Sequence, residues 1–212
     1  PNGARFVTNT VRCGIFPDLL QKLLEARRAA KKAMREASGE QRRILNARQL
    51  ALKDISNSFY GYTGYVRARL FMLDVANAIT AHGRLNIEKT KKLVEEQFNM
   101  AVVYGDTDSI FVKTATTNLD EAKELGDRIS ALVTKELGGY LELEFEKTYR
   151  TFLILTKKRY VGWSFRKEGD EWKDTIEMKG IETVRRDWCP LVSETMREVI
   201  DIIMKDGDVQ RA

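Results

Sequence analysis

Cysteine, histidine and proline are scarce in this sequence of 212 residues, and the first two shortages argue against whole classes of site. The two cysteines, Cys13 and Cys189, are isolated and far apart, so they form no CxxC or Cys/His cluster of the kind that binds zinc. Such a pair is typical of free thiols in a reducing compartment. His82 is the only histidine, and any Ser/His or Cys/His mechanism would depend on it alone. We interpret it as structural or exposed.

Long apolar runs are also lacking. No stretch approaches the roughly 18 apolar residues that a membrane-spanning helix requires, and there is no signal peptide. We therefore expect a cytoplasmic protein without membrane contact. The first residue, Pro1, is consistent with a mature chain that has lost its Met or with a fragment. Hydrophobic residues make up 43% and charged residues 32% of the chain, which predicts a globular fold with a charge-rich surface.

Basic residues exceed acidic ones, and the formal net charge is +5. Basic residues are concentrated in two segments. These are residues 22–43, where lysine and arginine outnumber glutamate, and the run Lys-Lys-Arg-Tyr at 157–160. The excess is modest, but its concentration in two segments favours a polyanionic partner.

Apolar residues recur at helical spacing in two neighbouring segments, 17–38 and 40–60, which are separated by Gly39. Because the connection is so short, the two helices are predicted to be antiparallel neighbours. Gly61 and Gly64 are expected to end the second helix. Further helices are predicted over 66–98, with an interruption near Gly83 and Asn86, over 118–137 and over 190–204.

Strand patterns occur between and after these helices. Apolar and charged residues alternate over 141–149, which predicts a half-buried strand that presents three glutamates on its other face. Strands predicted over 152–155, 160–165 and 175–178 continue the same sheet, and residues 1–16 consist of short β-like pieces. The predicted fold class is α+β: an antiparallel helical hairpin attached to a domain with an antiparallel β-sheet and packed helices.

Two carboxylates stand out within the sequence Tyr-Gly-Asp-Thr-Asp-Ser at 104–109. Apolar, β-branched runs flank this segment, which predicts a tight β-hairpin with Asp106 and Asp108 at its tip. Two close carboxylates repel each other unless a cation or a proton relieves them. Hard oxygen ligands suit Mg²⁺, which usually takes one or two carboxylates plus substrate phosphates. Taken alone, the same residues also suit a turn without chemistry, because Asp and Gly are common turn residues.

The two helices of the predicted hairpin carry a second set of polar candidate residues. Arg27 and Lys31 are four residues apart on one face of the first helix, while Lys53, Asn57 and Tyr60 share one face of the second. If the two faces converge, three cations and an amide line one strip, which suits a triphosphate because several oxygens must be neutralised at once. An ordinary solvated face of a basic helix is the alternative.

Three separated motifs, in matching order and spacing, resemble family-B DNA polymerases. Lys53 with residues 57–61, Asn-Ser-Phe-Tyr-Gly, resembles the fingers motif Lys-x3-Asn-Ser-x-Tyr-Gly of that family. Residues 104–109 match its palm motif Tyr-Gly-Asp-Thr-Asp-Ser, and residues 157–160 resemble its Lys-Lys-Arg-Tyr contact to the primer duplex. Residues 180–187 resemble the segment that ends the palm. The resemblance covers nearly the whole chain and is greatest for archaeal members.

The resemblance implies a role for each matching position. The residues that would hold the incoming nucleotide are Arg27, Lys31, Lys53, Asn57 and Tyr60, where Arg27 and Lys31 are chosen over Arg28 and Lys32 by register. Asp108 and its neighbour Asp106 would be the catalytic carboxylates that bind two Mg²⁺ ions. The contacts to primer DNA would be Lys158, Arg159 and Tyr160. For Glu144 and Glu146, a place near the metals and a solvated strand face both remain open.

Domain bounds follow from the same resemblance. Residues 1–16 would be a palm-edge segment that contacts a partner, and residues 17–64 the fingers hairpin. Residues 65–187 would be the palm, and residues 188–212 a C-terminal helix that starts a truncated thumb.

One expected motif is missing. The family's palm needs another carboxylate, in Asp-x-x-Ser-Leu-Tyr-Pro-Ser, and no aspartate of this chain begins that motif. We therefore expect little or no polymerase activity from the isolated chain and a larger partner subunit that supplies the motif and the exonuclease domain, as in split family-B polymerases. The other expected partners are primer–template DNA, dNTPs and a sliding clamp, at the nucleoid. A non-catalytic DNA-binding module and an excised fragment of a longer polymerase are the alternatives.

Overall fold

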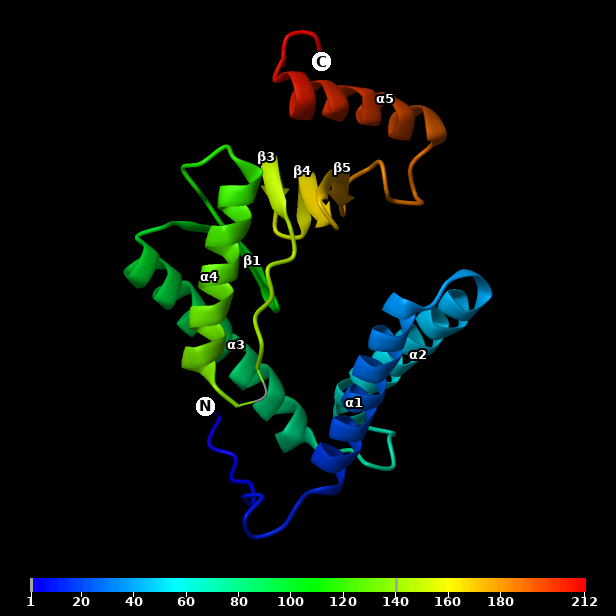
Figure 1. Ribbon diagram of the computed structural model, residues 1–212, viewed down its shortest axis with the longest axis vertical. Coiled ribbons are helices and arrows are strands. Elements are labelled where there is room, and N and C mark those ends of the chain that lie inside the picture. Colours follow the sequence, from blue (N-terminus) through cyan, green and yellow to red (C-terminus); the bar gives the residue numbers. More distant parts are fainter. Residues whose placement is uncertain (1, 140) are drawn as a thin grey trace. The chain divides into compact units, whose positions relative to one another are not determined.

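The chain folds into two compact units, Pro1–Asn86 and Ile87–Ala212, and the computed structural model describes residues 2–139 and 141–212. Helices α1 (Ile15–Glu36) and α2 (Gly39–Gly64) lie in the first unit, and α3 (Leu73–Phe98) continues from the first unit into the second (Figure 1). The second unit holds the β-strands. This mixture confirms the predicted α+β class. The predicted domain bounds, including the part that falls on Pro1 outside the described residues, stay predictions.

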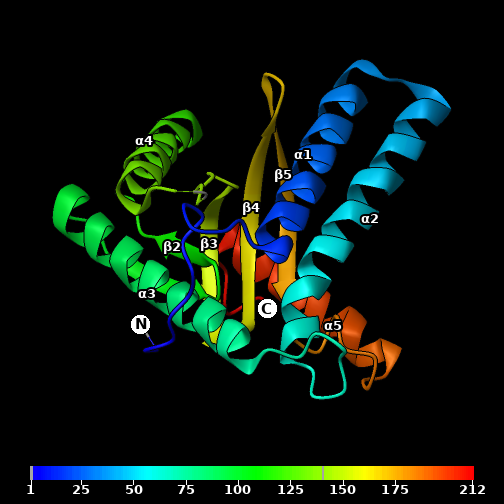
Figure 2. The same cartoon turned by 90° about the horizontal axis from the view of Figure 1, so that it is seen from below.

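Helices α1 and α2 run antiparallel and side by side, as predicted (Figure 2). Their buried and half-buried positions follow alternating spacings of three and four residues, which is the seam of an antiparallel helix pair. These seam positions are Phe16, Leu20, Leu23, Arg27, Ala30 and Met34 in α1 and Leu45, Gln49, Leu52, Ser56, Phe59 and Thr63 in α2. At the open end of the hairpin the rings of Phe16 and Phe59 meet edge to face, with centroids 5.7 Å apart.

Several predictions for the first unit are wrong. Helix α2 passes through Gly61, where it was expected to end, although its end at Gly64 agrees with the prediction. The long segment 66–98 is helical only from Leu73, and α3 is then continuous through Gly83, where an added Cβ would meet no atom within 4 Å. A glycine in an exposed helix lowers stability by about 1 kcal/mol relative to alanine but does not break the helix. Residues 2–14 contain turns and irregular backbone but no strand among those described.

A small core in the second unit joins the acidic hairpin to two helices. Strands β1 (Val102–Asp106) and β2 (Ser109–Val112) pair antiparallel, and α4 (Leu119–Leu137) follows. The buried centre consists of Val94 from α3 with Ile129 and Val133 from α4, and apolar residues of both strands pack against it. The predicted hairpin and the helix over 118–137 are confirmed.

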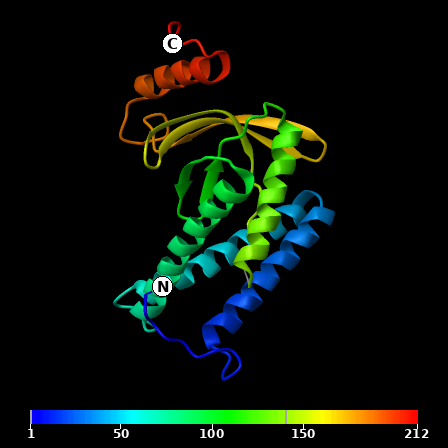
Figure 3. The same ribbon diagram turned by 90° about the vertical axis from the view of Figure 1, so that its left-hand side faces the viewer.

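A three-stranded antiparallel sheet forms the rest of the second unit. Its strands are β3 (Thr148–Thr156), β4 (Arg159–Glu168) and β5 (Glu171–Lys179), in that order. Helix α5 (Pro190–Asp201) and a short π-helix (Ile202–Asp206) cover one face of the sheet, while residues 87–98 of α3, helix α4 and the acidic hairpin lie on the other side (Figure 3). The buried residues under α5 are Val161, Ile181, Ile200 and Met204.

The predicted strand over 141–149 is wrong in its first part. Strand pairing begins at Thr148, and among the described residues 141–147 no backbone ladder forms. The segment packs on α4 instead: the backbone N–H of Leu143 donates to Thr134 Oγ1 at 2.9 Å, and Phe145 lies against Gly126. Strands β1 and β2 form a separate two-stranded sheet.

Candidate active site

The tip of the acidic hairpin is a turn of three residues. The backbone N–H of Asp108 donates to the carbonyl of Asp106 at 2.7 Å, and Thr107 between them has φ 56°. A β-branched residue rarely adopts positive φ, and a γ-type turn of this kind is strained. The Thr107 hydroxyl donates to Asp106 Oδ1 at 3.1 Å. The turn therefore places two carboxylates one residue apart and orients the first of them.

Asp106 is paired with a lysine from the turn between β3 and β4. Lys158 Nζ lies 3.1 Å from Asp106 Oδ1, and the two side chains are 64% and 28% exposed. The hydrogen bond from Lys158, supported by the one from Thr107, holds the pKa of Asp106 below its ordinary value despite some desolvation. One of the two predicted catalytic carboxylates thus already has a cation beside it.

The backbone of Lys158 is held from two sides. Its N–H donates to the hydroxyl of Tyr104 on β1 at 2.9 Å, and its φ of 65° is in the left-handed region. On the other side, Gly180 (φ 63°) comes so near that an added Cβ would lie 2.5 Å from the Lys158 carbonyl oxygen. Only glycine suits that position. This arrangement fixes where the Lys158 side chain starts and hence keeps its ammonium near Asp106.

The two other predicted DNA-contact residues have partners within the protein. Arg159 Nε donates to the carbonyl of Gly180 at 3.1 Å, and its guanidinium pairs with Glu182. Tyr160 is half-buried among aromatic rings, and burial raises the pKa of its hydroxyl. Both residues therefore help to shape the turn that carries Lys158, and their contacts to DNA stay predictions.

Aromatic rings attach the acidic hairpin to the three-stranded sheet. Tyr104 and Phe111 from the hairpin meet Phe152 and Tyr160 from the sheet, with ring centroids 4.9–6.5 Å apart. Gly162 is required beneath them, because a Cβ there would overlap the ring of Tyr149. Aromatic pairs at these distances are favourable beyond their buried area. They hold Asp106 and Lys158, which belong to different sheets, in one place.

Asp108 has a different environment. Its side chain is exposed, and among the described residues it has no hydrogen bond or ion pair. It opens onto a groove of about 840 Å³ between β2, α4 and the segment 142–150. Strand β2 pairs only with β1 in the described part of the chain, so its other edge borders this groove. One carboxylate is therefore free to take a ligand, beside open space.

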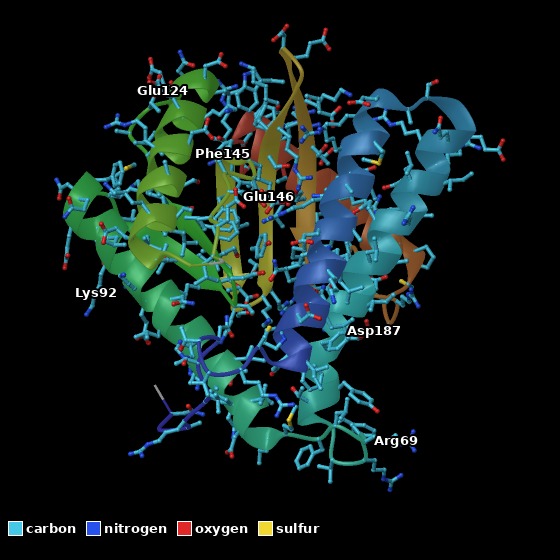
Figure 4. The ribbon with its side chains drawn as sticks, turned by 60° about the horizontal axis from the view of Figure 1, so that its bottom comes forward. Arg69, Lys92, Glu124, Phe145, Glu146 and Asp187 are labelled. Atoms are coloured by element: carbon cyan, nitrogen blue, oxygen red, sulfur yellow. The ribbon has the colours of Figure 1, made fainter. Side chains whose placement is uncertain are left out.

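No third carboxylate in the described part of the chain completes a metal centre. Among residues 2–139 and 141–212, no group of three or more His, Cys, Asp or Glu side chains is placed to bind a metal ion. Glu144 and Glu146, the second of which is labelled in Figure 4, both line the same groove as Asp108. Glu146 also accepts a hydrogen bond of 2.9 Å from Arg166. The donor set of Asp106 and Asp108 fits Mg²⁺ chemically but supplies only two side-chain ligands.

Sequence reasoning missed a partly buried ionic network beside this site. Lys147 Nζ lies 2.6 Å from Glu177 Oε2, both side chains are less than one fifth exposed, and Tyr149 donates to the same carboxylate at 2.8 Å. Burial alone would raise the pKa of Glu177, but the hydrogen bonds from Lys147 and Tyr149 outweigh it and lower that pKa. The only sequence signal was a lysine at an inward position of the alternating pattern.

The predicted nucleotide-binding residues all belong to the helical hairpin. Arg27 is on the seam, and its Nε is buried without a hydrogen-bond partner in the described structure. Lys31, Lys53, Asn57 and Tyr60 are exposed, and each directly follows a seam position. Because both helices are right-handed and antiparallel, residues that follow seam positions lie on the same side of the pair. The roles of these five residues stay predictions.

Comparisons with known proteins agree on one family. The profile described as DNA polymerase family B matches residues 1–212. The chain is 40% identical to the DNA polymerase delta catalytic subunits of Oryza sativa subsp. japonica, over 223 residues, and of Schizosaccharomyces pombe, over 221 residues. Each match covers 100% of this chain and 20% of the relative, so the chain spans about a fifth of their length. The corresponding subunit of Plasmodium falciparum is similar to the same degree.

Proposed function

This chain belongs to DNA polymerase family B, and we propose that it supplies the fingers and part of the palm of a DNA-directed DNA polymerase. The observation that carries the proposal is the acidic hairpin, with Asp108 unpaired among the described residues and Asp106 beside Lys158. A binding module has no need for two carboxylates at the tip of a strained turn, since they would repel DNA phosphates. No described helix is long and apolar enough to cross a membrane.

In this proposal the hairpin carboxylates hold Mg²⁺. When bound, the two ions supply charge stabilisation for the attacking 3′-hydroxyl and the leaving oxygen. Asp108 is the primary ligand because its carboxylate has no partner in the described structure, whereas Asp106 must share its charge with Lys158. The turn at Thr107 orients the Asp106 carboxylate before substrate arrives. Such pre-orientation lowers the reorganisation needed during the reaction.

The helical hairpin holds the triphosphate of the incoming nucleotide. Lys31 and Lys53 would neutralise phosphate oxygens from one side of the helix pair, and Asn57 on the same side would donate hydrogen bonds. The Nε of Arg27 is buried and has no hydrogen-bond partner among the described residues, so a phosphate ligand would satisfy it. Tyr60 would line the nascent base pair. Lys158 would contact the primer strand, with Arg159 and Tyr160 as supports of its turn.

The catalytic centre needs a carboxylate from outside this sequence. The motif Asp-x-x-Ser-Leu-Tyr-Pro-Ser is absent, and the described residues offer no third ligand near Asp106 and Asp108. We propose that a larger polymerase subunit supplies this carboxylate and also carries the exonuclease domain. The assembly would act at the nucleoid together with a sliding clamp. The archaeal, split-subunit type remains part of this proposal, although the relatives named above are eukaryotic.

A primer-extension assay tests the proposal. The isolated chain, given primer–template DNA, dNTPs and Mg²⁺, is expected to incorporate little or nothing, and the reconstituted assembly is expected to extend the primer. Robust incorporation by the isolated chain would refute partner dependence. In the assembly, Asp108→Ala should abolish incorporation while DNA binding is retained. Unchanged incorporation by that variant would support a non-catalytic DNA-binding module instead.

A further inference from the structure

We propose that segment 62–71, which is the last turn of α2 and the loop before α3, binds the unpaired template strand by stacking its bases on exposed rings. The inference rests on the proposed polymerase function and assigns a ligand to a surface outside the acidic hairpin. The elements that carry it are three aromatic rings, two arginines and a rigid backbone.

Three aromatic rings of this segment are open to solvent. Tyr62 is 41% exposed, Tyr65 is 55% exposed and Phe71 is 37% exposed. Exposed aromatic rings within a short stretch offer flat surfaces on which successive nucleic-acid bases stack, independently of sequence. Bases of a duplex are already stacked within the helix, so such rings favour a single strand.

The charge of the segment matches a phosphate backbone. Arg67 and Arg69 are exposed, and neither has a carboxylate partner in the described structure. Figure 4 shows Arg69 pointing away from the ribbon of the loop. Between Asp54 and Asp74 the sequence has no acidic residue. Two unpaired cations beside exposed rings, without any acid, favour a polyanionic strand over a protein partner.

Backbone hydrogen bonds hold the segment in one shape. The N–H of Met72 donates to the carbonyl of Thr63 at 2.9 Å, and that of Ala68 donates to Tyr65 at 2.9 Å. The N–H of Arg69 donates to the hydroxyl of Tyr62 at 3.3 Å, so this ring is fixed by the loop itself. A surface that is ordered beforehand loses less entropy on binding.

The position along the chain indicates the template strand. Segment 62–71 follows directly after Tyr60, the residue proposed to line the nascent base pair. Gly64, where the helix ends, lies about 6 Å further along the helix axis at 1.5 Å per residue. That distance corresponds to roughly two nucleotides of a strand. The next unpaired template bases are therefore within reach of Tyr62 and Tyr65.

A binding assay with two DNA ligands tests the inference. One ligand is a hairpin duplex with an unpaired 5′ overhang and the other is the same duplex with a blunt end, each measured by fluorescence anisotropy with the full chain. We expect the chain to bind the overhang DNA about fivefold or more tightly, the value of one stacked base. Tyr65→Leu should remove most of this preference, and Tyr65→Phe, which keeps the ring, should restore it. Trp188→Leu, at another exposed ring, should leave it unchanged.

Charge is tested separately. The double variant R67Q/R69Q should reduce the salt dependence of overhang binding by about 1.4 in slope, since each contact to a single strand contributes about 0.7. The matched control K92Q/R128Q removes two exposed cations from α3 and α4 that have no partner in the described structure. It should leave the difference between the two DNA ligands unchanged.

The outcomes separate this inference from the proposed function. Equal affinity for both ligands, or a preference that survives Tyr65→Leu, would overturn the stacking surface and would favour a protein contact there. If Lys158→Gln weakens the binding of blunt DNA, the proposed function remains supported even when the stacking surface is overturned. Binding of neither ligand, or blunt-end binding that is unaffected by Lys158→Gln, would count against the proposed function itself.

Discussion

The backbone N–H of Lys158 donates a hydrogen bond of 2.9 Å to the hydroxyl of Tyr104, so a residue of β1 fixes the turn between β3 and β4. Tyr104→Phe removes this acceptor and leaves the ring contacts in place. We expect the free energy of unfolding to fall by about 1 kcal/mol, the usual contribution of one hydrogen bond. Urea denaturation would measure the change.

Tyr160→Phe is the matched control for that experiment. Tyr160 belongs to the same aromatic cluster, but its hydroxyl has no hydrogen bond among the described residues. Its removal should change stability by less than about 0.5 kcal/mol. Equal losses for the two variants would show that the hydrogen bond to Lys158 does not fix the turn.

Gly180→Ala should lower the stability of the fold more than the exposed position of this residue suggests. The added Cβ would lie 2.5 Å from the Lys158 carbonyl oxygen, and the positive φ of 63° is unfavourable for alanine. Gly169→Ala has nearly the same φ, 66°, but its Cβ would meet no atom within 4 Å. Gly169→Ala should therefore cost about 1 kcal/mol, and Gly180→Ala about 1–3 kcal/mol more. Thermal unfolding of both variants measures the difference, and equal effects would contradict the close approach.

Gly126→Ala tests how the unpaired segment 141–147 is held. A Cβ at residue 126 would overlap the ring of Phe145, so the segment must move away from α4. Overpacking of this kind typically lowers stability by about 1–3 kcal/mol. Gly83→Ala in α3, which meets nothing within 4 Å, should instead stabilise by up to about 1 kcal/mol. Stabilisation by both variants would mean that Phe145 does not lie on Gly126.

That segment also illustrates where sequence patterns fail. Alternation over 141–149 correctly indicated that Leu143 and Phe145 face inward, because the two-residue period reports burial of an extended chain. This period does not indicate which groups form hydrogen bonds with the backbone N–H and C=O groups. Here the N–H of Leu143 goes to the side chain of Thr134, nine residues earlier, rather than to a neighbouring strand.

The acidic hairpin was predictable because its signal is local. Apolar strands and turn residues within a few positions determine it, and Asp106 pairs with Ser109 across the turn. Arg159 was less predictable, since its partner Glu182 is 23 residues away and no local pattern connects them. The seam of the helical hairpin followed from periodicity only in part, because the polar residues Gln49 and Ser56 lie on it while the apolar Ile44 is exposed. The charge of Arg27 likewise gives no sign that its Nε is buried.

The Lys147–Glu177 pair should make stability depend on acid pH. Its hydrogen bonds lower the pKa of Glu177, so the pair stabilises the fold above the unfolded glutamate pKa of about 4.3. That stabilisation is lost as the pH falls through the lower, folded pKa. Glu177→Gln should remove this pH dependence and destabilise by about 2 kcal/mol, because the largely buried Lys147 loses its nearest carboxylate and keeps only the exposed Glu146, 3.4 Å away. Glu171→Gln, an exposed residue on the same strand, should do neither when both are unfolded in urea across this pH range.

Lys158 should compete with divalent cations for Asp106, because both neutralise the same carboxylate. Lys158→Gln removes the hydrogen bond that contributes most to the lowered pKa of Asp106, so that pKa should rise in an NMR titration. Lys157→Gln removes an equal charge that acts only through space, and it should raise the pKa of Asp106 less. The affinity of the isolated chain for Mn²⁺, measured by paramagnetic broadening, should increase a fewfold in Lys158→Gln, in line with the energy of one water-screened charge pair. A lower Mn²⁺ affinity in Lys158→Gln would contradict this competition, because it would mean that Lys158 holds the carboxylates in place for the cation. DNA that drew Lys158 away from Asp106 would then weaken cation binding there.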